Sequence, residues 1–374
     1  MTVGIVGAGQ LGRMMALAGY PLGLDFLFLD KDAGTPGGQV APLIPGALDD
    51  RELLGQLSQR CEVVTFDWEN IPVASLENLP GAARISPPLR ALAVAQDRLT
   101  EKRSFELLGI PTTQYAAVDS RESLELAART IGLPGVLKTR RLGYDGKGQF
   151  VLRKPADLDR AWEALGKAPL LYENLVPFDA EVSVIAVRGQ DGDVVFYPLN
   201  LNVHREGILR LTRAPYGNVA LTRQAHRAAK KLLEHFRYVG VLTIEFFVKR
   251  GKLIANEMAP RVHNSGHWTI EGAETSQFEN HLRAVLGWPL GETRMLGHAC
   301  MLNWIGAMPD SAAVLREPGG YWHDYGMQPR DGRKVGHATL RADTREALGT
   351  ALERVGAALG RESQVAPVVE RLRG

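Results

Sequence analysis

The chain has 374 residues, enough for two or three domains with hydrophobic cores, and its net charge of +2 gives no indication of a nucleic-acid or membrane partner. No apolar run approaches the roughly 18 residues of a membrane-spanning helix, and the sequence begins with a strand pattern where a leader peptide would have basic and then apolar residues. Because Cys61 and Cys300 lie far apart without ligand spacing, we expect a soluble protein of the reducing cytoplasm.

The first predicted element is a short apolar strand, Thr2 to Val6, which leads into a glycine-rich turn and a helix. Gly7 to Gly12 has the G-x-G-x-x-G spacing that presents backbone N–H groups to a phosphate. The next strand, Leu24 to Leu29, ends in Asp30, where a dinucleotide-binding protein has its ribose-binding acid. An NAD-linked oxidoreductase would fit this pattern, but no later segment supplies a dehydrogenase's catalytic pair. The turn therefore indicates a phosphate without identifying the molecule that carries it.

The next segments continue an α/β pattern. A helix is predicted from Asp49 to Arg60 and a strand from Glu62 to Phe66. The polar cluster Asp67 to Asn70 follows that strand, where open α/β sheets bind ligands, although a loop with a helix cap explains it equally well. Arg84 to Ala95 is expected to be a connection, and we place the first domain boundary near Gln96.

The second domain is predicted to open with a helix from Asp97 to Leu108. Further on, the strands Gly135–Lys138 and Phe150–Arg153 flank a glycine-rich tip, Gly143–Gln149, with many free N–H groups. The tip joins two strands and lacks G-K-[ST], so it is predicted to be a lid over phosphates and not a P-loop. The alternative is a tight hairpin without function. Lys138 favours the lid, because burying an ammonium group without an anion is costly.

Several polar residues follow on predicted strands. Leu170 to Val176 ends in a connection whose backbone could bind an adenine edge. Glu181 either accepts ribose hydroxyls or is an exposed strand acid, and His204 is either a site residue or a structural histidine. An amphipathic helix is predicted from Thr222 to Phe236.

The rest of the chain is organised around the stretch from Gly240 to Thr269. Val241–Val248 and Leu253–Glu257 have the pattern of two strands joined by a tight turn. A turn centred near Gly251 places Glu245 and Glu257 opposite each other, with Cβ atoms about 5 Å apart, so that their charges repel. We therefore expect a cation between these two acids.

The chemistry that suits this hairpin is a magnesium site. Two carboxylates completed by phosphate oxygens are a usual way to bind Mg²⁺, and Asn256 adds an amide beside Glu257. The following loop has donors that suit a small anion better than a packing role, namely Arg261, His263, Asn264, Ser265 and His267. The alternative, a solvated hairpin with a polar loop, does not explain acids at strand positions between apolar residues.

The end of the chain is predicted to form a third, small domain. Its expected elements, after a helix from Ser276 to Val285, are strands near Ala299–Asn303 and Val335–Ala342 and a helix from Thr344 to Ala358. The basic stretch Arg330 to His337, with Arg341 beyond it, either holds a substrate phosphate or forms a solvated turn.

Six segments, which together span essentially the whole chain, carry a family resemblance. They are GAGQLGRM, DRLTEK, RRLGYDGKGQ, the segment FYPL with the following N, H and GILR, NEMAPRVHNSGHWT and GRKVGH. By these motifs the chain resembles the 5-(carboxyamino)imidazole ribonucleotide synthase family of ATP-grasp ligases. The N-terminal glycine motif is weak alone, whereas NEMAPRVHNSGHWT is highly specific. Three positions depart from the family pattern, namely Asp67, Met327 and Asp331.

The resemblance implies a fold and its domains. The fold class is α/β, with α+β character in the ATP-binding part. It is an ATP-grasp fold with an N-terminal Rossmann-like pre-ATP-grasp domain and a small C-terminal domain. The implied domains are a substrate-phosphate domain at 1–96, an ATP-grasp domain at 97–290 and a substrate-closing domain at 291–374. The ATP-grasp domain would divide into a lid subdomain, 97–172, and a metal and nucleotide subdomain, 173–290.

The resemblance also implies an activity in purine biosynthesis. ATP and bicarbonate would carboxylate the exocyclic amine of 5-aminoimidazole ribonucleotide through carboxyphosphate, releasing ADP and phosphate. Mg²⁺, or Mn²⁺ in its place, would be the metal, without NAD or biotin. The partners would be these small molecules and a second copy of the chain, with no nucleic acid or membrane. The alternatives are a formate-dependent glycinamide ribonucleotide transformylase, a biotin carboxylase or another ATP-grasp carboxylase, an NAD-linked oxidoreductase, and a non-catalytic nucleotide sensor.

Individual residues receive roles from the same resemblance. ATP contacts are implied for Arg98, Lys138, Gly143, Tyr144, Asp145, Gly146, Lys147, Gly148, Gln149, Glu173, Val176, Glu181, His204, Asn256 and Glu257. Metal ligands would be Glu245 and Glu257. Catalytic roles fall to Asp145 at the amine, to Arg261, His263 and Asn264 at bicarbonate and carboxyphosphate, and to Lys334. Substrate contacts are implied for Gln10, Leu11, Tyr144, Lys334 and Arg341.

Overall fold

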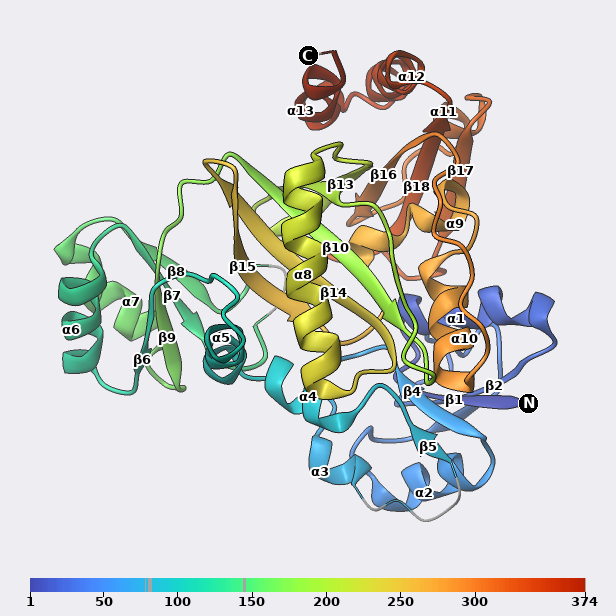
Figure 1. Cartoon of the computed structure of the whole chain (residues 1–374), viewed down its shortest axis with the longest axis horizontal. Helices are drawn as coiled ribbons and strands as arrows, with labels where there is room; N and C mark the ends of the chain where they lie inside the picture. Colours follow the sequence, from blue (N-terminus) through green and yellow to red (C-terminus); the bar gives the residue numbers. More distant parts are fainter. Residues whose placement is uncertain (78, 80–82, 144–145, 374) are drawn as a thin grey trace.

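The computed structural model describes residues 1–77, 79, 83–143 and 146–373, and these residues form three sheets (Figure 1). Two residues of the expected lid tip, Tyr144 and Asp145, lie outside the described residues. Among the described residues, no helix is both long and apolar enough to cross a membrane.

The N-terminal sheet is parallel, with strand order β3-β2-β1-β4-β5. Its strands are β1 (Thr2–Val6), β2 (Asp25–Asp30), β3 (Leu43–Pro45), β4 (Val63–Phe66) and β5 (Arg84–Ile85). Its helices are α1 (Gln10–Gly19), α2 (Arg51–Gln59), α3 (Val73–Leu76) and α4 (Leu89–Ala95). The strands predicted near residues 2, 24 and 62 and the helix predicted from 49 are confirmed.

The prediction of a plain connection from Arg84 to Ala95 was wrong, because this segment holds β5 and α4. β5 has two residues, paired in parallel with β4, and is too short to show a periodic pattern. Pro88 directly precedes α4, a position that proline suits because the first helical N–H groups have no partner within the helix.

A second sheet forms a separate lobe at the left of Figure 1. It is antiparallel, with order β6-β9-β7-β8. Its strands are β6 (Tyr115–Val118), β7 (Gly135–Thr139), β8 (Gln149–Leu152) and β9 (Leu170–Asn174), and the helices packed on it are α6 (Arg121–Ile131) and α7 (Leu158–Leu165). The preceding helix, α5 (Arg98–Leu107), packs on α4 and β15. The predicted lid is therefore the β7–β8 hairpin.

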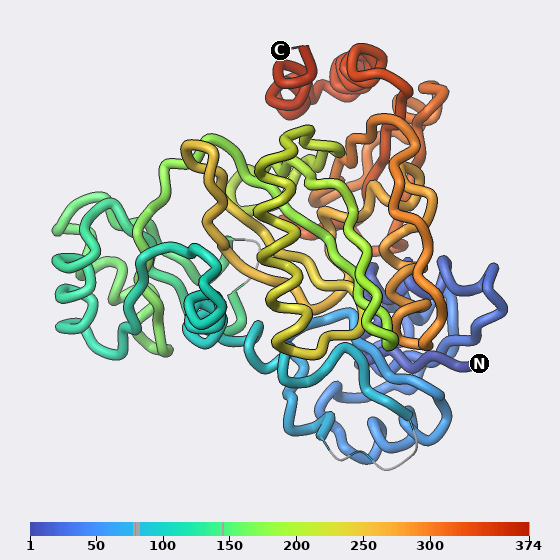
Figure 2. The backbone as a smooth tube through the Cα atoms, viewed as in Figure 1, coloured from blue at the N-terminus to red at the C-terminus, as the bar shows by residue number. Residues whose placement is uncertain are grey.

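The central sheet is antiparallel, with order β15-β14-β10-β12-β13-β16-β18-β17 and with β11 beside β10. Its strands are β10 (Ala180–Arg188), β11 (Val194–Phe196), β12 (Asn200–Arg205), β13 (Ile208–Ala214), β14 (Gly240–Lys249), β15 (Lys252–Ala259), β16 (His298–Ile305), β17 (Gly320–Asp324) and β18 (Lys334–Ala342). Because β16 pairs with β13, the strands of the C-terminal region extend the sheet that carries the acidic hairpin. The tube in Figure 2 follows this path from the green and yellow strands to the orange and red ones, with the C-terminus at the top and the N-terminus at the lower right.

Helices cover the central sheet and connect it to its neighbours. They are α8 (Val219–Phe236), α9 (Thr269–Gly272), α10 (Gln277–Leu286), α11 (Ala312–Leu315), α12 (Arg345–Ala358) and α13 (Glu362–Arg373). α8 packs on β10, β14 and β15, whereas α10 packs on β14 and on α1 of the N-terminal sheet. Buried His281 of α10 joins the two sheets, since its ring contacts Thr65 Oγ1 at 2.9 Å and accepts from Val241 N at 3.2 Å.

The sequence analysis expected no element after residue 358, and α13 was therefore missed. Pro367 lies inside this helix, and an internal proline normally indicates that a helix ends. Burial of Val365, Val368 and Leu372, in a core cluster shared with residues of α12, supplies the tertiary packing that supports the helix in spite of the proline.

The β14–β15 hairpin has the predicted pair of acids, which its turn and a bulge together produce. Arg250 and Gly251 form its two-residue turn with φ values of 49° and 71°, the pattern of a type I′ turn. Glu245 pairs with Glu257, as predicted. The next pair joins Phe246 to Ala255, so Asn256 is the extra residue of a β-bulge.

We predict opposite stability changes for two glycine-to-alanine substitutions. Gly251→Ala should lower the free energy of unfolding by about 1 kcal/mol, since a left-handed conformation penalises a Cβ atom. Gly349→Ala should raise it by about 0.5 to 1 kcal/mol, because Gly349 lies within α12 and a Cβ there meets only Leu372, at 3.9 Å or more. Thermal unfolding of both variants measures these effects, and a stabilised Gly251→Ala variant would contradict the turn geometry.

Candidate active site

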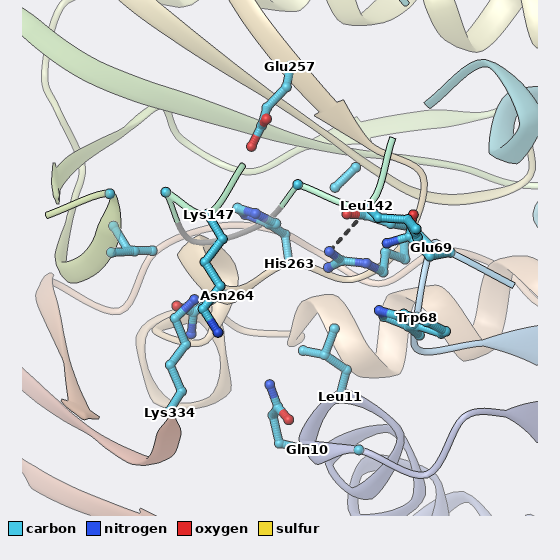
Figure 3. A pocket seen from close by; sticks show the side chains of 18 of the residues that line it. Gln10, Leu11, Trp68, Glu69, Leu142, Lys147, Glu257, His263, Asn264 and Lys334 are labelled. Carbon is cyan, nitrogen blue, oxygen red and sulfur yellow. Dashed lines mark ion pairs between the residues drawn. The ribbon is translucent and has the colours of Figure 1, made fainter. Parts of the chain in front are cut away.

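A cavity of about 1150 Å³ lies where the three sheets approach one another (Figure 3). Its wall combines the N-terminal end of α1, the β7–β8 hairpin, the β14–β15 hairpin and the loop before β18. Most of the predicted site residues line it: Gln10, Leu11, Arg98, Lys138, Gly143, Gly146, Lys147, Gln149, Glu181, His204, Glu245, Asn256, Glu257, Arg261, His263, Asn264 and Lys334. The structure therefore gathers residues from position 10 to position 334 around one cavity.

Four of the described residues expected at the site do not line this cavity, namely Gly148, Glu173, Val176 and Arg341. Val176 is buried, and Gly148 lies in the lid turn with φ of 70°. Arg341 donates to the Glu271 carbonyl oxygen at 2.9 Å and lies over the Tyr321 ring. Their predicted contacts with ATP or substrate remain predictions.

Glu173 lies behind Lys138 and holds it in place. It is 2% exposed, and its two carboxylate oxygens lie 3.0 Å from Lys138 Nζ and 3.2 Å from Lys102 Nζ. Burial alone would raise the pKa of Glu173, but the two ammonium groups and a hydrogen bond from Thr113 hold it below its ordinary value. Lys138 therefore has its anion within the protein and still reaches the cavity.

The acidic hairpin offers three oxygen donors to the cavity. Glu257 Oε2 lies 2.9 Å from Arg98 Nη1, and Glu245 Oε1 lies 3.5 Å from His263 Nε2. Asn256 Oδ1 is buried and has no hydrogen-bond partner among the described residues. The part of the chain that is described has no cluster of three or more His, Cys, Asp or Glu side chains suited to a metal. The donors therefore fit a hard cation such as Mg²⁺ that takes its remaining ligands from phosphate and water.

The two acids have different protonation properties. Burial, together with the charge of Glu257, raises the pKa of Glu245 to about 7. Burial acts in the same direction on Glu257, but the charge and hydrogen bond of Arg98 outweigh it and lower the pKa. At neutral pH the pair thus has one firmly ionised carboxylate and one that ionises readily when a cation binds.

A third titratable group, His204, is a cation at neutral pH. Burial by itself disfavours the charged ring, but the hydrogen bond to Glu181 Oε2, 3.0 Å from Nδ1, and the charge of Glu245 raise its pKa to about 9. His204 therefore adds positive charge beside the acidic hairpin.

The loop after the hairpin places Arg261, His263 and Asn264 on the cavity wall, and this group, whose chemistry suits an anion, is called the anion pocket below. Arg261 Nη2 lies 2.9 Å from Glu69 Oε2, an ion pair marked in Figure 3. The Asn264 amide exchanges two hydrogen bonds with the buried Asn303 amide, at 2.6 and 3.1 Å. Burial, with the charges of Arg261, Lys334 and His204, lowers the pKa of His263 well below its ordinary value. The pocket therefore combines a guanidinium group, a neutral imidazole and an amide.

Lysines approach this pocket from two elements. Figure 3 shows the Lys147 side chain extending from the lid toward Asn264 and Lys334, where β18 begins. Register shifts fall beside three of the site residues, at Glu245, at His204 and near Lys334. Such bulges change the direction in which a strand presents its side chains and are frequent near active sites.

Acidic side chains occupy several N–H groups of the N-terminal glycine turn. Asp30 Oδ2 accepts from Ala8 N at 2.7 Å, and Asp67 Oδ2 accepts from Gly9 N at 2.6 Å and Gly12 N at 3.2 Å. Burial raises the pKa of Asp67 to about 7 despite these hydrogen bonds. A ribose-binding role of Asp30 is therefore not supported, because its carboxylate binds the turn itself.

Sequence analysis missed several residues that support the site. Lys102 and Glu101 are 1% and 2% exposed, and Glu101 accepts from Met258 N at 2.7 Å. The signal for Lys102 was present, because it lies three residues from both Leu99 and Phe105 on the buried face of α5. Asn303 is a polar residue between apolar ones on β16, but its partner, Asn264, lies on a distant loop that the local pattern does not identify.

Comparison with known proteins gives a consistent result along the chain. Residues 1–96 match the ribonucleotide synthetase preATP-grasp domain, residues 103–278 the ATP-grasp domain, and residues 299–351 the phosphoribosylaminoimidazole carboxylase C-terminal domain. The N5-carboxyaminoimidazole ribonucleotide synthase of Pseudomonas aeruginosa is 49% identical over 357 residues, covering 96% of this chain and 99% of that protein. The predicted ATP-grasp fold class is thereby confirmed.

Solved structures that are similar to this chain carry the same family name as its sequence relatives. The N5-carboxyaminoimidazole ribonucleotide synthetase of Thermus thermophilus superposes with a TM-score of 0.91 at 50% identity, covering 95% of this chain and 98% of that one. The N5-carboxyaminoimidazole synthase of Aspergillus clavatus, in complex with ADP and 5-aminoimidazole ribonucleotide, gives a TM-score of 0.87 at 30% identity, covering 100% and 98%.

Proposed function

The chain belongs to the N5-carboxyaminoimidazole ribonucleotide synthase family of ATP-grasp ligases, and from this membership we infer its reaction and propose how its residues perform it. It catalyses the ATP-dependent carboxylation of 5-aminoimidazole ribonucleotide in purine biosynthesis. The observation that carries the proposal is the placement of an acidic hairpin and an anion pocket on the wall of one cavity.

The first step activates bicarbonate, which is a poor electrophile. We assign the phosphate chain of ATP to the space between the lid and the acidic hairpin, near Arg98, Lys138 and Lys147. A bicarbonate oxygen attacks the γ-phosphorus, the bond to the β-phosphate oxygen breaks, and ADP leaves, giving carboxyphosphate. Arg261, His263 and Asn264 orient the bicarbonate and stabilise the charge of the product.

The described residues fit Mg²⁺ at the hairpin. Glu245, Glu257 and Asn256 would hold it, and when bound it would neutralise charge on the phosphate oxygens. Arg98 keeps Glu257 ionised and directed toward the cavity, since their contact is 2.9 Å long.

The second step joins carbon to nitrogen. The exocyclic amine attacks the carboxyl carbon of carboxyphosphate, or the CO₂ released from it, with loss of phosphate and of one amine proton. Asp145 is the proposed residue that orients or deprotonates the amine, with Tyr144 beside the substrate; both lie outside the described residues. Gln10 and Leu11 N–H groups with Lys334 are proposed to hold the ribonucleotide phosphate, and Arg341 would join them after leaving the Glu271 carbonyl.

Three further assignments belong to the proposal. The three-domain division follows the predicted boundaries near residues 96 and 290, although β13 and β16 share a sheet across the second boundary. A homodimer and a cytoplasmic location remain predictions.

The test of the function is ADP release measured with and without 5-aminoimidazole ribonucleotide and bicarbonate. We expect release to require both, and the carboxylated ribonucleotide to form in equal amount. Replacing bicarbonate by formate should give no formylated product. A rate of ADP release that does not depend on the ribonucleotide would instead identify a nucleotide sensor or a different ligase.

We predict that magnesium binding depends on pH through Glu245. Because the pKa of this acid is raised to about 7, it is protonated at lower pH and ionised at higher pH. The affinity for Mg²⁺ with ADP should therefore increase from pH 6 to pH 8, by at most about tenfold per unit on the acid side, and then level off. Calorimetric titration at each pH measures this. Glu245→Gln should bind weakly without this rise, and a rise that persists in that variant would assign the proton elsewhere.

A further inference from the structure

A network of buried polar side chains lies behind His263, away from the cavity. It contains Ser265, in the short 3₁₀ helix Asn264–Gly266, Ser183 on β10 and Asn200 on β12, and each of these three side chains is 0% exposed. Asn200 Nδ2 lies 3.0 Å from Ser183 Oγ, Ser183 Oγ lies 2.8 Å from Ser265 Oγ, and Ser265 Oγ lies 2.8 Å from His263 Nδ1. The reaction proposed above assigns no role to these three residues.

The direction of the hydrogen bonds follows from groups that have fixed roles. Asn200 Nδ2 also lies 2.9 Å from the Ser265 carbonyl oxygen, which can only accept, so this end of the amide is its nitrogen. Ser183 Oγ therefore accepts from Asn200, and also from Asn202 Nδ2 at 3.0 Å. Its own proton is then directed to Ser265 Oγ, and the Ser265 proton is directed to His263 Nδ1.

A second contact also shows that His263 Nδ1 accepts a hydrogen bond, and this contact does not depend on where the serine hydroxyl protons lie. The Ser265 backbone N–H lies 3.3 Å from His263 Nδ1, and a backbone N–H can only donate. His263 Nδ1 is thus an acceptor by two separate contacts. The proton of the neutral ring must lie on Nε2, which faces Glu245 Oε1 at 3.5 Å on the cavity wall.

We propose that Asn200, Ser183 and Ser265 form a one-way hydrogen-bond relay that fixes His263 in its Nε2–H tautomer, so that the ring offers an N–H donor to an oxyanion in the cavity. Ser183 and Ser265 are positioning residues, because they act through His263. The nature of the oxyanion, bicarbonate or carboxyphosphate, rests on the proposed function, whereas the tautomer does not. A fixed donor stabilises charge on such an anion without reorganising when the anion forms.

The tautomer is tested directly by ¹⁵N NMR of the whole protein labelled at histidine, with His263→Gln used to assign the signals. We expect Nδ1 of His263 to resonate as an unprotonated acceptor and Nε2 as a protonated nitrogen. A proton found on Nδ1 would overturn the proposal. This measurement needs neither substrate nor activity, so it stands even if the proposed reaction is wrong.

The relay is tested by a double-mutant cycle in ADP release. Ser265→Ala should lower kcat on the order of tenfold, the lower end of the effect seen when residues that orient metal-bound histidines are removed. Ser183→Ala should lower kcat less, with the KM for ATP unchanged in both variants. The double variant should be no slower than Ser265→Ala, because Ser183 acts only through Ser265. Both single variants should also show more of the Nδ1–H tautomer of His263 than the wild type does, although the Ser265 backbone N–H still favours Nε2–H. Effects that multiply, or an unchanged tautomer in both, would refute the relay.

A matched control removes a buried hydroxyl elsewhere in the same sheet. Thr339 on β18 has a buried Oγ1 without a hydrogen-bond partner among the described residues. Thr339→Val should leave kcat and the His263 signals unchanged. Unfolding curves for all variants separate loss of the relay from loss of the fold. If an alanine variant fails to fold, the wild-type tautomer still decides the proposal.

Discussion

Glu257→Gln is expected to reduce ADP release on the order of 10³-fold while the fold remains intact. The substitution keeps the shape of the side chain but removes the carboxylate that Arg98 holds ionised at 2.9 Å. A metal that neutralises phosphoryl charge contributes several kcal/mol to the transition state, and each 1.36 kcal/mol changes the rate about tenfold. ADP release in the presence of 5-aminoimidazole ribonucleotide and bicarbonate measures the loss.

The matched control is Glu234→Gln on α8, where the same substitution removes a surface charge with 61% of its side chain exposed. This variant should release ADP at the wild-type rate. Unfolding of Glu257→Gln should occur at a somewhat lower temperature than in the wild type, because Arg98 loses the carboxylate that it pairs with, but the variant should remain folded under the assay conditions. Near-normal, substrate-stimulated ADP release from Glu257→Gln would remove the metal assignment of the hairpin.

Arg261→Ala is expected to lower bicarbonate-dependent turnover by about 10² to 10³-fold with little change in ADP affinity. Its guanidinium lines the anion pocket and is oriented by Glu69, whereas the proposed nucleotide contacts come from the lid and the hairpin. Removing one preorganised donor from a site of developing negative charge typically costs this much in kcat. Rates as a function of bicarbonate, together with calorimetric binding of ADP, separate the two effects.

The control for Arg261 is Arg129→Ala on α6, which breaks an arginine–glutamate pair whose arginine is 75% exposed. Exposed pairs of this kind contribute little, so neither activity nor ADP affinity should change. An Arg261→Ala variant that loses ADP binding as severely as turnover would place Arg261 in the nucleotide site.

The hairpin and the lid were predictable because their signals are local. Strand alternation on both sides of Gly251 fixes the turn, and the turn brings Glu245 close to residues 256 and 257. The bulge at Asn256 then pairs Glu245 with Glu257. The lid was visible because closely spaced glycines stand between two short apolar strands. In these two segments, the secondary structure predicted from the local sequence is the one observed.

The partners of the charged residues were not predictable, because they depend on the order of strands. Glu173 faces Lys138 only because β9 pairs with β7, which places the two residues diagonally across neighbouring strands. Asp67 reaches the turn after β1 because β4 lies next to β1 in the sheet. Such contacts depend on which distant strands pair, and the order of strands in a sheet cannot be read from a single sequence.

The continuous central sheet sets the spacing of the reacting groups. Glu245, Glu257, His204, Asn303 and Lys334 are all carried by strands of this one backbone-bonded array, whereas the lid belongs to another. On the proposed assignment, the acids beside the nucleotide's terminal phosphate and Lys334 beside the ribonucleotide's phosphate are therefore held at a set distance before either molecule arrives. A synthetic molecule that joins mimics of the two by a stiff tether of that length would lose little freedom on binding and should outbind its flexible counterpart.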